Sequence, residues 1–341
     1  MTLIFLAAAL VLAAAALFTV SPTLFLPPAI LLEPPFAQLL ALRAETAVVL
    51  LVLAAVMLCL RMLCRNRIRK LIVALAAAIL FLCSGFQFSV LLKRGMSAVE
   101  KISSSASSHS LGQIVFLTYN TKGGATPPAR LAEIIAENGV NVAVLPETSA
   151  ADGRRLLKLL AERNLRFQYF DTHTDRWTPA FASTVLLISP QLGRYVPYRS
   201  VFSGAKEARV SLVGARPLSA AGPKIVGVHP VSPIVGRTDV WKKGISGVYA
   251  MCGKDSNLII GGDFNSTFDH QRIVGARCAD AAREAGIGGL GSWPSSVPNL
   301  LASPIDRIIH TQTKYRGYEG KFVRRGDSDH YGMIISLRIK K

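Results

Sequence analysis

The sequence has few acidic residues, no metal-type cysteine spacing and no internal repeat. Each of these absences limits the kinds of protein that it can encode. Its 341 residues contain 21 Asp and Glu against 39 Lys and Arg, which gives a formal net charge of +18 at pH 7. Such an excess attracts polyanions or anionic lipid headgroups, although it does not determine a fold. The 5 cysteines have no spacing typical of a metal site, which excludes a cysteine-based zinc motif. No internal repeat occurs, which excludes a solenoid or a propeller.

Long hydrophobic runs are confined to the first hundred residues. Three of them, 2–20, 46–64 and 71–92, are each about 19–22 residues long, enough to cross roughly 30 Å of hydrocarbon as a helix. We therefore expect residues 1–100 to form a membrane region with about three transmembrane helices. A cleaved signal peptide is the alternative for the first run, although no basic residue precedes its apolar stretch. Both interpretations predict targeting to the membrane.

Basic residues are concentrated between the second and third runs, whereas the segment 21–45 has Arg43 against two glutamates. Basic loops tend to stay in the cytoplasm, so the N-terminus is expected inside and the chain after the third run outside. Lys93, Arg94 and Lys101 follow that run and oppose this orientation weakly. The sequence thus predicts a multi-pass protein of the cell membrane with an extracytoplasmic C-terminal domain.

A serine-rich segment, 101–112 (KISSSASSHSLG), separates the membrane region from the rest of the chain. It has no hydrophobic period, so we expect a flexible linker. Residues 113–341 then form one domain, long enough to bury a substantial core. This domain contains 30 Lys and Arg against 18 Asp and Glu. The charge fits either polyanion binding or simply a soluble surface near a membrane.

Cys252 and Cys278 are the cysteines of this domain. An extracytoplasmic compartment permits a disulfide between them. The sequence does not supply the Cα separation that a bridge requires, so the pairing stays open at this point.

Strand-like and helix-like segments alternate through the domain. The runs 113–119 and 141–147 are rich in β-formers and enclose TPPARLAEIIAENG, in which Thr126 is expected to cap a helix. This mixture predicts sheets with helices on their outer faces. Further helices are expected at about 150–163, 238–252 and 275–286, and further strands at about 182–188, 208–213, 225–229, 304–309 and 332–339, with one more strand leading into GGDFN.

Polar residues stand where several of these strands end, and functional sites are commonly built there. Taken singly, an acid at a strand end is usually a turn former, and a lone histidine is usually structural. Together they supply oxygen ligands for a hard cation such as Mg²⁺, two histidines, and an acid able to orient one of them. That inventory suits phosphoryl chemistry, which needs neutralised phosphate charge and a base near water. The residues are Asn120, Glu147, His229, Asp263, Asn265, Asp306, Asp329 and His330.

The segments LTYNT, LPET, HP, GGDFN, PIDRII and SDH occur in the order found in the endonuclease/exonuclease/phosphatase superfamily, which most of 113–341 resembles. That superfamily includes deoxyribonuclease I, exonuclease III, bacterial sphingomyelinases and inositol-polyphosphate phosphatases. The resemblance implies an α/β fold, a two-sheet β-sandwich flanked by helices in four layers. It also implies a metal-dependent hydrolase acting on phosphoric esters, of the nuclease or phosphodiesterase type.

The resemblance implies a metal site as well. Glu147 matches the metal-binding glutamate of the family, Asn120 the asparagine that helps to hold metal and phosphate, and Asp329 the aspartate before the last histidine. Mg²⁺ is the expected ion, with Mn²⁺ or Ca²⁺ as alternatives.

Catalytic roles follow from the same resemblance. His330 resembles the histidine beside the scissile phosphate, and Asp306 the carboxylate that fixes its ring. Asp263 and Asn265 are expected to orient or deprotonate the attacking water and to bind a phosphoryl oxygen. His229, which matches a histidine of the deoxyribonuclease I and sphingomyelinase branch, is expected to bind phosphate or to protonate the leaving group. The general base stays open between Asp263 and His330.

Lys122 departs from the pattern, because the exonuclease III branch usually carries an acid two residues after the asparagine. Together with His229 it points away from abasic-site repair. The substrate stays open among nucleic acid, phospholipid headgroup and inositol phosphate, since neither an aromatic-rich insertion nor an Arg/aromatic alternation is present. The expected partners are the lipid bilayer and the phosphoester, with no protein partner evident. A non-catalytic, membrane-tethered binding module is the alternative from another class, although every matched position has the expected chemical type.

Overall fold

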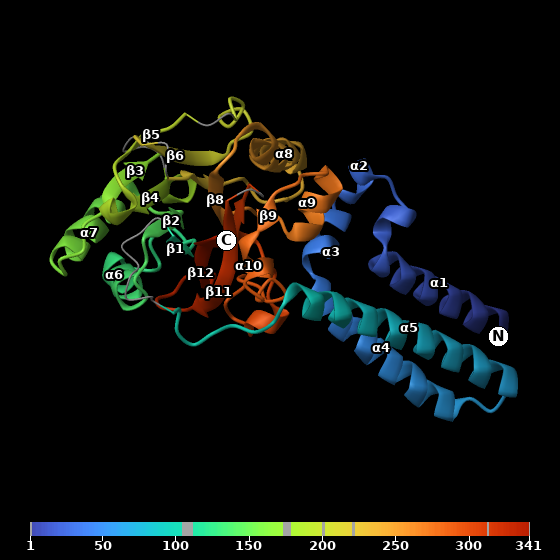
Figure 1. The fold of residues 1–341 in the computed structure, drawn as a ribbon. Helices are drawn as coiled ribbons and strands as arrows, with labels where there is room; N and C mark the ends of the chain where they lie inside the picture. Colours follow the sequence, from blue (N-terminus) through green and yellow to red (C-terminus); the bar gives the residue numbers. More distant parts are fainter. Residues whose placement is uncertain are drawn as a thin grey trace. The chain divides into compact units, whose positions relative to one another are not determined.

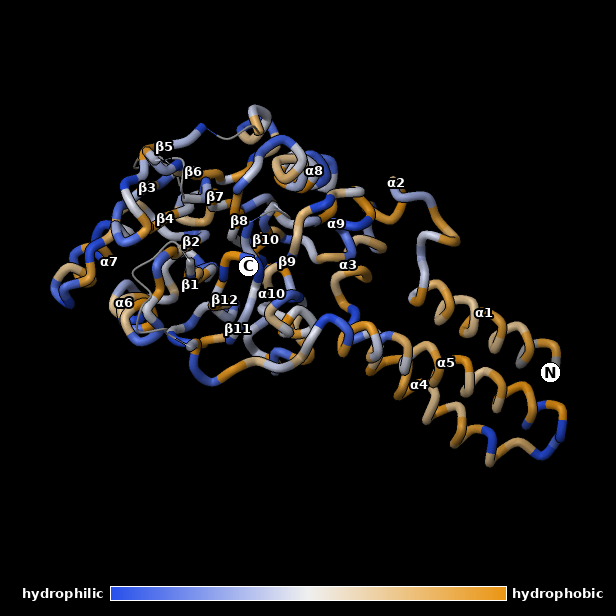
Figure 2. The backbone as a smooth tube through the Cα atoms, in the orientation of Figure 1, coloured by the Kyte–Doolittle hydropathy of each residue, from blue (hydrophilic) through white to orange (hydrophobic). Residues whose placement is uncertain are grey.

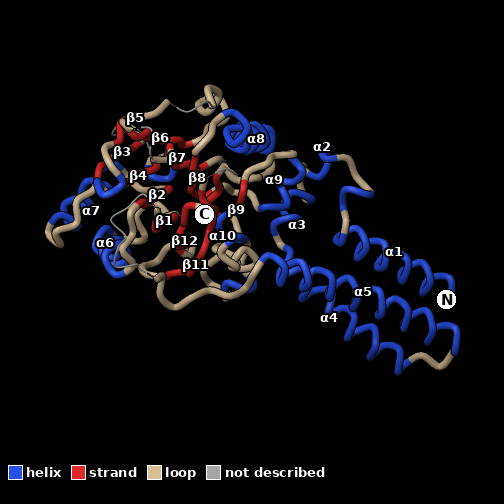
Figure 3. The backbone as a smooth tube through the Cα atoms, viewed as in Figure 1, coloured by secondary structure: helices blue, strands red, loops and turns tan. Residues whose placement is uncertain are grey.

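The computed structural model describes residues 2–103, 112–172, 179–199, 202–219, 222–311 and 314–340. Contacts divide the chain into two compact units, Met1–Lys93 and Arg94–Lys341. The regular structure of the first unit is helical, whereas the second combines helices with strands (Figure 3). Most of the serine-rich segment 101–112 lies outside the described residues, so the expected linker stays a prediction.

Three long helices account for most of the first unit: α1 (Thr2–Val20), α4 (Arg43–Leu63) and α5 (Arg67–Arg94). Within the described residues, α4 and α5 are long and apolar enough to cross a membrane, and a shorter apolar helix covers Leu6–Val20. All three transmembrane spans expected from the sequence therefore stay a prediction. Figure 2 shows that all three helices are mainly hydrophobic and that the turn between α4 and α5 is hydrophilic. Short helices connect α1 to α4: η1 (Pro22–Leu24), α2 (Pro28–Leu31) and α3 (Phe36–Ala41).

Two six-stranded mixed sheets form the second unit, with strand orders β11-β12-β1-β2-β4-β3 and β5-β6-β7-β8-β10-β9. Each sheet contains a parallel pair, β1 with β2 and β7 with β8, while the other described pairs are antiparallel. The strands of the first sheet are β1 (Gln113–Thr118), β2 (Val142–Pro146), β3 (Gln168–Asp171), β4 (Thr184–Ile188), β11 (Tyr315–Val323) and β12 (Gly332–Ile339). Those of the second are β5 (Tyr195–Pro197), β6 (Ser211–Pro217), β7 (Lys224–His229), β8 (Leu258–Asp263), β9 (Ala279–Asp280) and β10 (Asp306–His310).

Helices cover the outer faces of the two sheets (Figure 1). The first sheet packs against α6 (Pro128–Glu137) and α7 (Ala150–Ala161), which bury leucines and isoleucines on their inner sides. The second sheet lies beside α8 (Thr238–Lys254), whose Trp241 is fully buried. Between the sheets, apolar side chains such as Phe116 form the main core. The predicted arrangement of two sheets flanked by helices is confirmed.

The prediction of one helix over residues 275–286 is wrong. Helix α9 (Phe268–Val274) begins earlier and ends at Gly275, whose φ of 79° leaves the right-handed helical region. The chain then forms β9, which pairs with β10, before the short helix α10 (Ala281–Glu284). The helix expected after Thr126 starts one residue later than predicted, with Pro127 at the N-cap. Three 3-10 helices complete the domain: η2 (Ala180–Ala182), η3 (Pro190–Leu192) and η4 (Asn299–Leu301).

Candidate active site

The first sheet brings three of the expected residues to one edge. Strands β1 and β2 run parallel, so Asn120 after β1 and Glu147 after β2 emerge on the same side. Strand β12 is antiparallel to β1, so the loop that precedes it returns to this edge and carries Asp329 and His330. The Ser328 hydroxyl, which sequence analysis did not single out, donates to the Asn120 carbonyl over 2.7 Å and fixes that loop.

The second sheet brings its site residues to one edge in the same way, through a parallel strand pair and an antiparallel neighbour. Strands β7 and β8 run parallel, so His229 and Asp263 lie at a common edge. Strand β10 is antiparallel to β8, and its first residue, Asp306, pairs directly with Asp263 in the register. The two sheets thus contribute matching edges, each built from a parallel pair and an antiparallel neighbour.

The glycines before Asp263 are explained by close approaches. A Cβ on Gly261 would lie 2.4 Å from the Phe116 ring of the facing sheet. A Cβ on Gly262 would lie 1.9 Å from the Val228 carbonyl oxygen, and the φ of Gly262 is 149°. These glycines are buried and allow the sheet edge to close around the site, which the GGDFN motif did not reveal by itself.

Three non-glycine residues at the site have left-handed backbones, with φ of 50° at Lys122, 55° at Glu147 and 45° at Asn265. Such conformations are uncommon and persist where the surroundings impose them. At Asn265 the backbone N–H donates to Asp263 Oδ1 over 2.8 Å, and the side-chain amide donates to the Pro230 carbonyl over 2.9 Å. Asn265 therefore ties the end of β8 to the loop after His229. Its expected phosphoryl contact stays a prediction.

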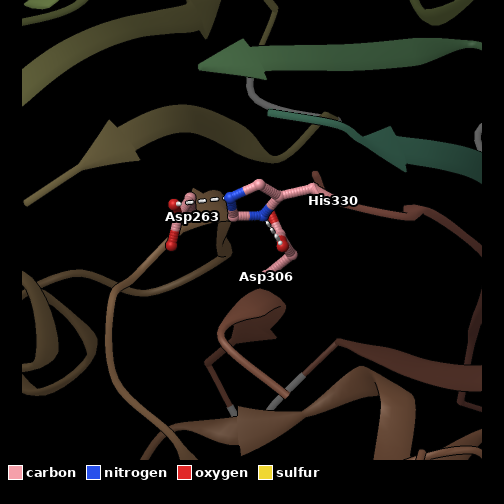
Figure 4. A group of neighbouring side chains, drawn as sticks. All are labelled: Asp263, Asp306 and His330. Carbon is pink, nitrogen blue, oxygen red and sulfur yellow. Dashed lines mark hydrogen bonds and ion pairs between the residues drawn. The ribbon is translucent and has the colours of Figure 1, made fainter. Parts of the chain in front are cut away.

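We define Asp263, Asp306 and His330 as the floor of the site (Figure 4). His330 Nδ1 lies 2.7 Å from Asp306 Oδ2, and its Nε2 lies 3.9 Å from Asp263 Oδ2. All three side chains are almost completely buried. Ser292, whose hydroxyl accepts the Asp306 backbone N–H over 3.1 Å, supports the carboxylate and was missed from the sequence. The ring of His330 is thus held in one orientation by Asp306.

The pKa values of Asp306 and His330 in the floor depend on each other. The pKa of Asp306 is raised, because burial and the charge of Asp263 outweigh the charge and hydrogen bond of His330, which lower it. Burial by itself would lower the pKa of His330, but the charge and hydrogen bond of Asp306, together with the charges of Asp263 and Asp329, raise it to about 9. His330 is therefore expected to carry its second ring proton at neutral pH, with its Nδ1 held by Asp306 over 2.7 Å.

Ligand atoms of the three floor residues lie within 4.8 Å of one another, so their spacing alone would allow a cation. One of the three ligands would be a ring nitrogen of His330, which already pairs with Asp306 over 2.7 Å, whereas Mg²⁺ prefers oxygen ligands. We therefore expect the metal outside the floor.

Beside the floor, Glu147 and His229 face Asp263. The Asn120 amide nitrogen donates to Glu147 Oε1 and to Asp263 Oδ2, each over 3.0 Å. His229 Nε2 lies 3.8 Å from Glu147 Oε1 and 3.7 Å from Asp263 Oδ2. Asn120 therefore orients two carboxylates through its amide nitrogen, while its Oδ1 accepts the Lys122 backbone N–H over 2.9 Å. Its expected part as a metal ligand stays a prediction.

We define Lys122, Asp329 and Trp293 as the mouth of the site. Lys122 Nζ lies 3.6 Å from Asp329 Oδ2, and the Trp293 indole N–H donates to the same oxygen over 3.3 Å. Asp329 Oδ1 lies 4.0 Å from His330 Nε2, which joins the mouth to the floor. Side-chain exposure rises from 2% at Asp263 through 21% at Glu147 to 38% at Asp329 and 54% at Lys122.

The site therefore contains all eight residues expected from the strand ends, connected by contacts of 4.0 Å or less. The family of the chain follows from comparison of its sequence with known protein families. Residues 117–330 match the sequence profile described as "Endonuclease/Exonuclease/phosphatase family". The chain belongs to this family. Its members are typically phosphoesterases or nucleases and generally depend on divalent metals.

Solved structures share the fold of this family member. A humanised form of D. rerio TDP2 with 14 mutations has a TM-score of 0.54 and 16% identity, over 67% of this chain and 100% of that one. D. rerio TDP2 in complex with a single-strand DNA product has a TM-score of 0.51 and 16% identity, over 66% of this chain and 99% of that one. Among curated proteins none matches the sequence. At these identities the likeness concerns the fold alone.

Proposed function

We propose that the protein is a membrane-anchored, divalent-metal-dependent phosphoesterase that hydrolyses phosphodiester bonds by in-line attack of water. The observation that carries the proposal is the meeting of Glu147, Asp263 and two histidines at the joined edges of both sheets. The combination offers oxygen ligands beside a buried carboxylate and imidazole rings, which are the groups that phosphodiester hydrolysis requires.

The donor set fits a hard divalent ion. Glu147 and Asp329 present partly exposed carboxylates, and Mg²⁺ is usually held by one or two carboxylates plus waters and substrate phosphate. These two residues would hold the ion, with Asn120 orienting Glu147. When bound, Mg²⁺, Mn²⁺ or Ca²⁺ would neutralise charge on the phosphate oxygens.

The remaining residues act on the water and the phosphate. Asp263 is the better candidate for the general base, because its carboxylate is buried among hydrogen-bond donors while His330 is already protonated. His330 would stabilise the charge that develops on the phosphoryl group, with Asp306 holding its ring. His229, beside Glu147 and Asp263, would contact the phosphate or protonate the leaving group.

The helical unit supports membrane anchoring. Many large apolar side chains of α4 and α5, including Val56 and Leu82, are exposed, which is the opposite of a helix in a soluble core. The structure also contains a disulfide between Cys252 and Cys278, with their Cα atoms 5.5 Å apart. Disulfides persist mainly in oxidising compartments, which supports an extracytoplasmic catalytic domain.

Nucleic acid is the substrate we favour. The domain has 30 Lys and Arg against 18 Asp and Glu, a charge balance suited to a polyanion. D. rerio TDP2, which shares the fold, was solved with a single-strand DNA product. A phospholipid or inositol-phosphate headgroup is the alternative within the same chemistry.

The experiment uses the full-length chain in lipid nanodiscs. We expect Mg²⁺-dependent hydrolysis of bis(p-nitrophenyl) phosphate, abolished by EDTA and by Asp263→Asn. A panel of DNA, RNA, sphingomyelin and phosphatidylinositol phosphates at low and high salt then identifies the substrate, since nucleic-acid binding weakens as salt rises. Absence of Mg²⁺-dependent release by the wild type would leave only the non-catalytic binding module.

Orientation in the membrane has its own test. A reporter fused after residue 341 is expected to be active only in the exported compartment, and a reporter inserted within 65–70 only in the cytoplasm. The reverse pattern would place the catalytic domain in the cytoplasm.

A further inference from the structure

Lys122 is the residue of the sequence pattern that the proposed function leaves without a role. Its backbone N–H donates to Asn120 Oδ1 over 2.9 Å, and its φ of 50° turns the chain sharply at this point. Its Nζ lies 3.6 Å from Asp329 Oδ2. The backbone is therefore fixed beside the metal-site residues, while the side chain extends to a carboxylate expected to bind the ion.

An ammonium group and a divalent ion compete for the same carboxylate. Asp329 and Lys122 are 38% and 54% exposed, and an ion pair in such a setting contributes little free energy. Glu147 and Asp329 would hold a divalent ion, whose charge is twice that of the ammonium. Lys122 would then release Asp329 and be free to reach another anion.

That anion is best placed outside the reacting centre. The floor is almost completely buried, whereas Lys122 is the most exposed charged group among the residues of the site described above. A lysine is a compact point charge on a flexible stem, which suits a phosphate whose position varies. A substrate with consecutive phosphodiesters would present such a group beside the scissile one, whereas a single diester would not.

We propose that Lys122 determines specificity for substrates with consecutive phosphates: it neutralises Asp329 before the metal binds and then contacts the phosphate next to the scissile one. This role depends on the proposed function and names the substrate class of the same site. It also makes metal loading a condition for the substrate contact.

The test compares Lys122→Met, Lys122→Arg and a matched control, Lys242→Met, in full-length protein in nanodiscs. Lys242 forms an ion pair with Asp239 over 2.8 Å. Both residues lie on α8, which contributes none of the expected metal ligands. The first readout is the Kd for Mn²⁺ by electron paramagnetic resonance. The second is KM for a 12-residue oligothymidylate of about ten consecutive phosphates, and for bis(p-nitrophenyl) phosphate, which has one.

Lys122→Met is expected to bind Mn²⁺ about two- to fivefold more tightly, because the competing ammonium is gone. Its KM for the oligonucleotide is expected to rise about tenfold, with KM for the single diester unchanged. Lys122→Arg is expected to restore the oligonucleotide KM, and Lys242→Met to match the wild type in both readouts.

Unchanged or weaker Mn²⁺ binding by Lys122→Met would overturn the proposal, and so would an equal rise in KM for both substrates. The Mn²⁺ measurement does not require turnover. A wild type that hydrolyses neither substrate would therefore refute the proposed function, while the Mn²⁺ titration would still decide whether Lys122 competes for Asp329.

Discussion

The floor and the mouth of the site differ in burial and in the way their charges are balanced. In the floor, Asp263, Asp306 and His330 are nearly inaccessible, and the His330 ring pairs with the Asp306 carboxyl over 2.7 Å. In the mouth, Lys122 and Asp329 are partly exposed and lie 3.6 Å apart. Electrostatic interactions are stronger and geometry is more fixed where water is excluded. The proposed function follows this difference: it assigns proton chemistry to the floor, and metal and substrate contacts to the mouth and Glu147.

Replacing the base gives the largest expected effect. Asp263→Asn keeps the shape of the side chain but removes its ability to accept a proton, so kcat for bis(p-nitrophenyl) phosphate is expected to fall by about 10²–10⁴-fold. Steady-state kinetics at saturating Mg²⁺ measure it, with Asp327→Asn, on the exposed loop before β12, as a control. A fall smaller than tenfold would remove Asp263 from the role of base.

The second-largest effect is expected from overpacking the backbone next to Asp263. Gly262→Ala would place a Cβ 1.9 Å from the Val228 carbonyl oxygen at a φ of 149°, so the strand pair has to separate. We expect a loss of stability of about 3 kcal/mol or more, by analogy with overpacking and backbone strain. Gly253→Ala, where a Cβ would have no neighbour within 4 Å, is the control. Thermal unfolding measures both, and equal melting temperatures would contradict the account of the GGDFN motif.

The pairing inside the floor predicts a pH dependence. The pKa of His330 is raised above its ordinary value to about 9, so the imidazolium is present below that pH and is lost as pH rises through it. Stability from the ion pair is likewise complete below about pH 6.5 and lost as pH rises through about 9.

Asp306→Asn removes the main charge that stabilises the imidazolium. The alkaline fall of kcat/KM is therefore expected to move from about pH 9 towards about pH 6.5. A kcat/KM profile at saturating metal measures this shift. An alkaline limb that stays in place would mean that Asp306 does not set the charge of His330.

Within the mouth, the Trp293 indole is expected to tolerate change. Trp293→Phe removes the indole N–H that reaches Asp329 over 3.3 Å but keeps an aromatic ring. We expect kcat to change by less than about threefold, because the lost hydrogen bond is partly exposed and water can replace it. A loss comparable to that of Asp263→Asn would erase the distinction between mouth and floor.

Much of this site was predictable because strand ends are local features. The β-rich runs before Asn120, Glu147 and Asp263 predicted where each strand ends, and the motif order predicted that the residues belong together. Strand β11 was missed, because its glycines and charged residues conceal the period of a strand. The helix expected at 275–286 was wrong, since the αL conformation of Gly275 and the pairing of β9 depend on tertiary contacts.

The electrostatic details were beyond the sequence. Neither the orientation of the Asn120 amide nor the ion pair of Lys122 with Asp329 follows from spacing, because both depend on distances between residues far apart in the chain. The left-handed backbone of Glu147 has no signal in its residue type. The sequence did show that Lys122 stands where the exonuclease III branch usually has an acid, and Lys122 is the residue to which we assign specificity at the mouth.

We propose that the metal binds at Glu147 and Asp329 and not within the floor. The most direct test of this proposal is an Mn²⁺ titration of the wild type, Glu147→Gln and His330→Ala, followed by electron paramagnetic resonance. We predict that Glu147→Gln weakens Mn²⁺ binding about tenfold or more, since it removes a charged ligand, and that His330→Ala leaves the affinity within about twofold. Loss of Mn²⁺ binding in His330→Ala with retention in Glu147→Gln would contradict it.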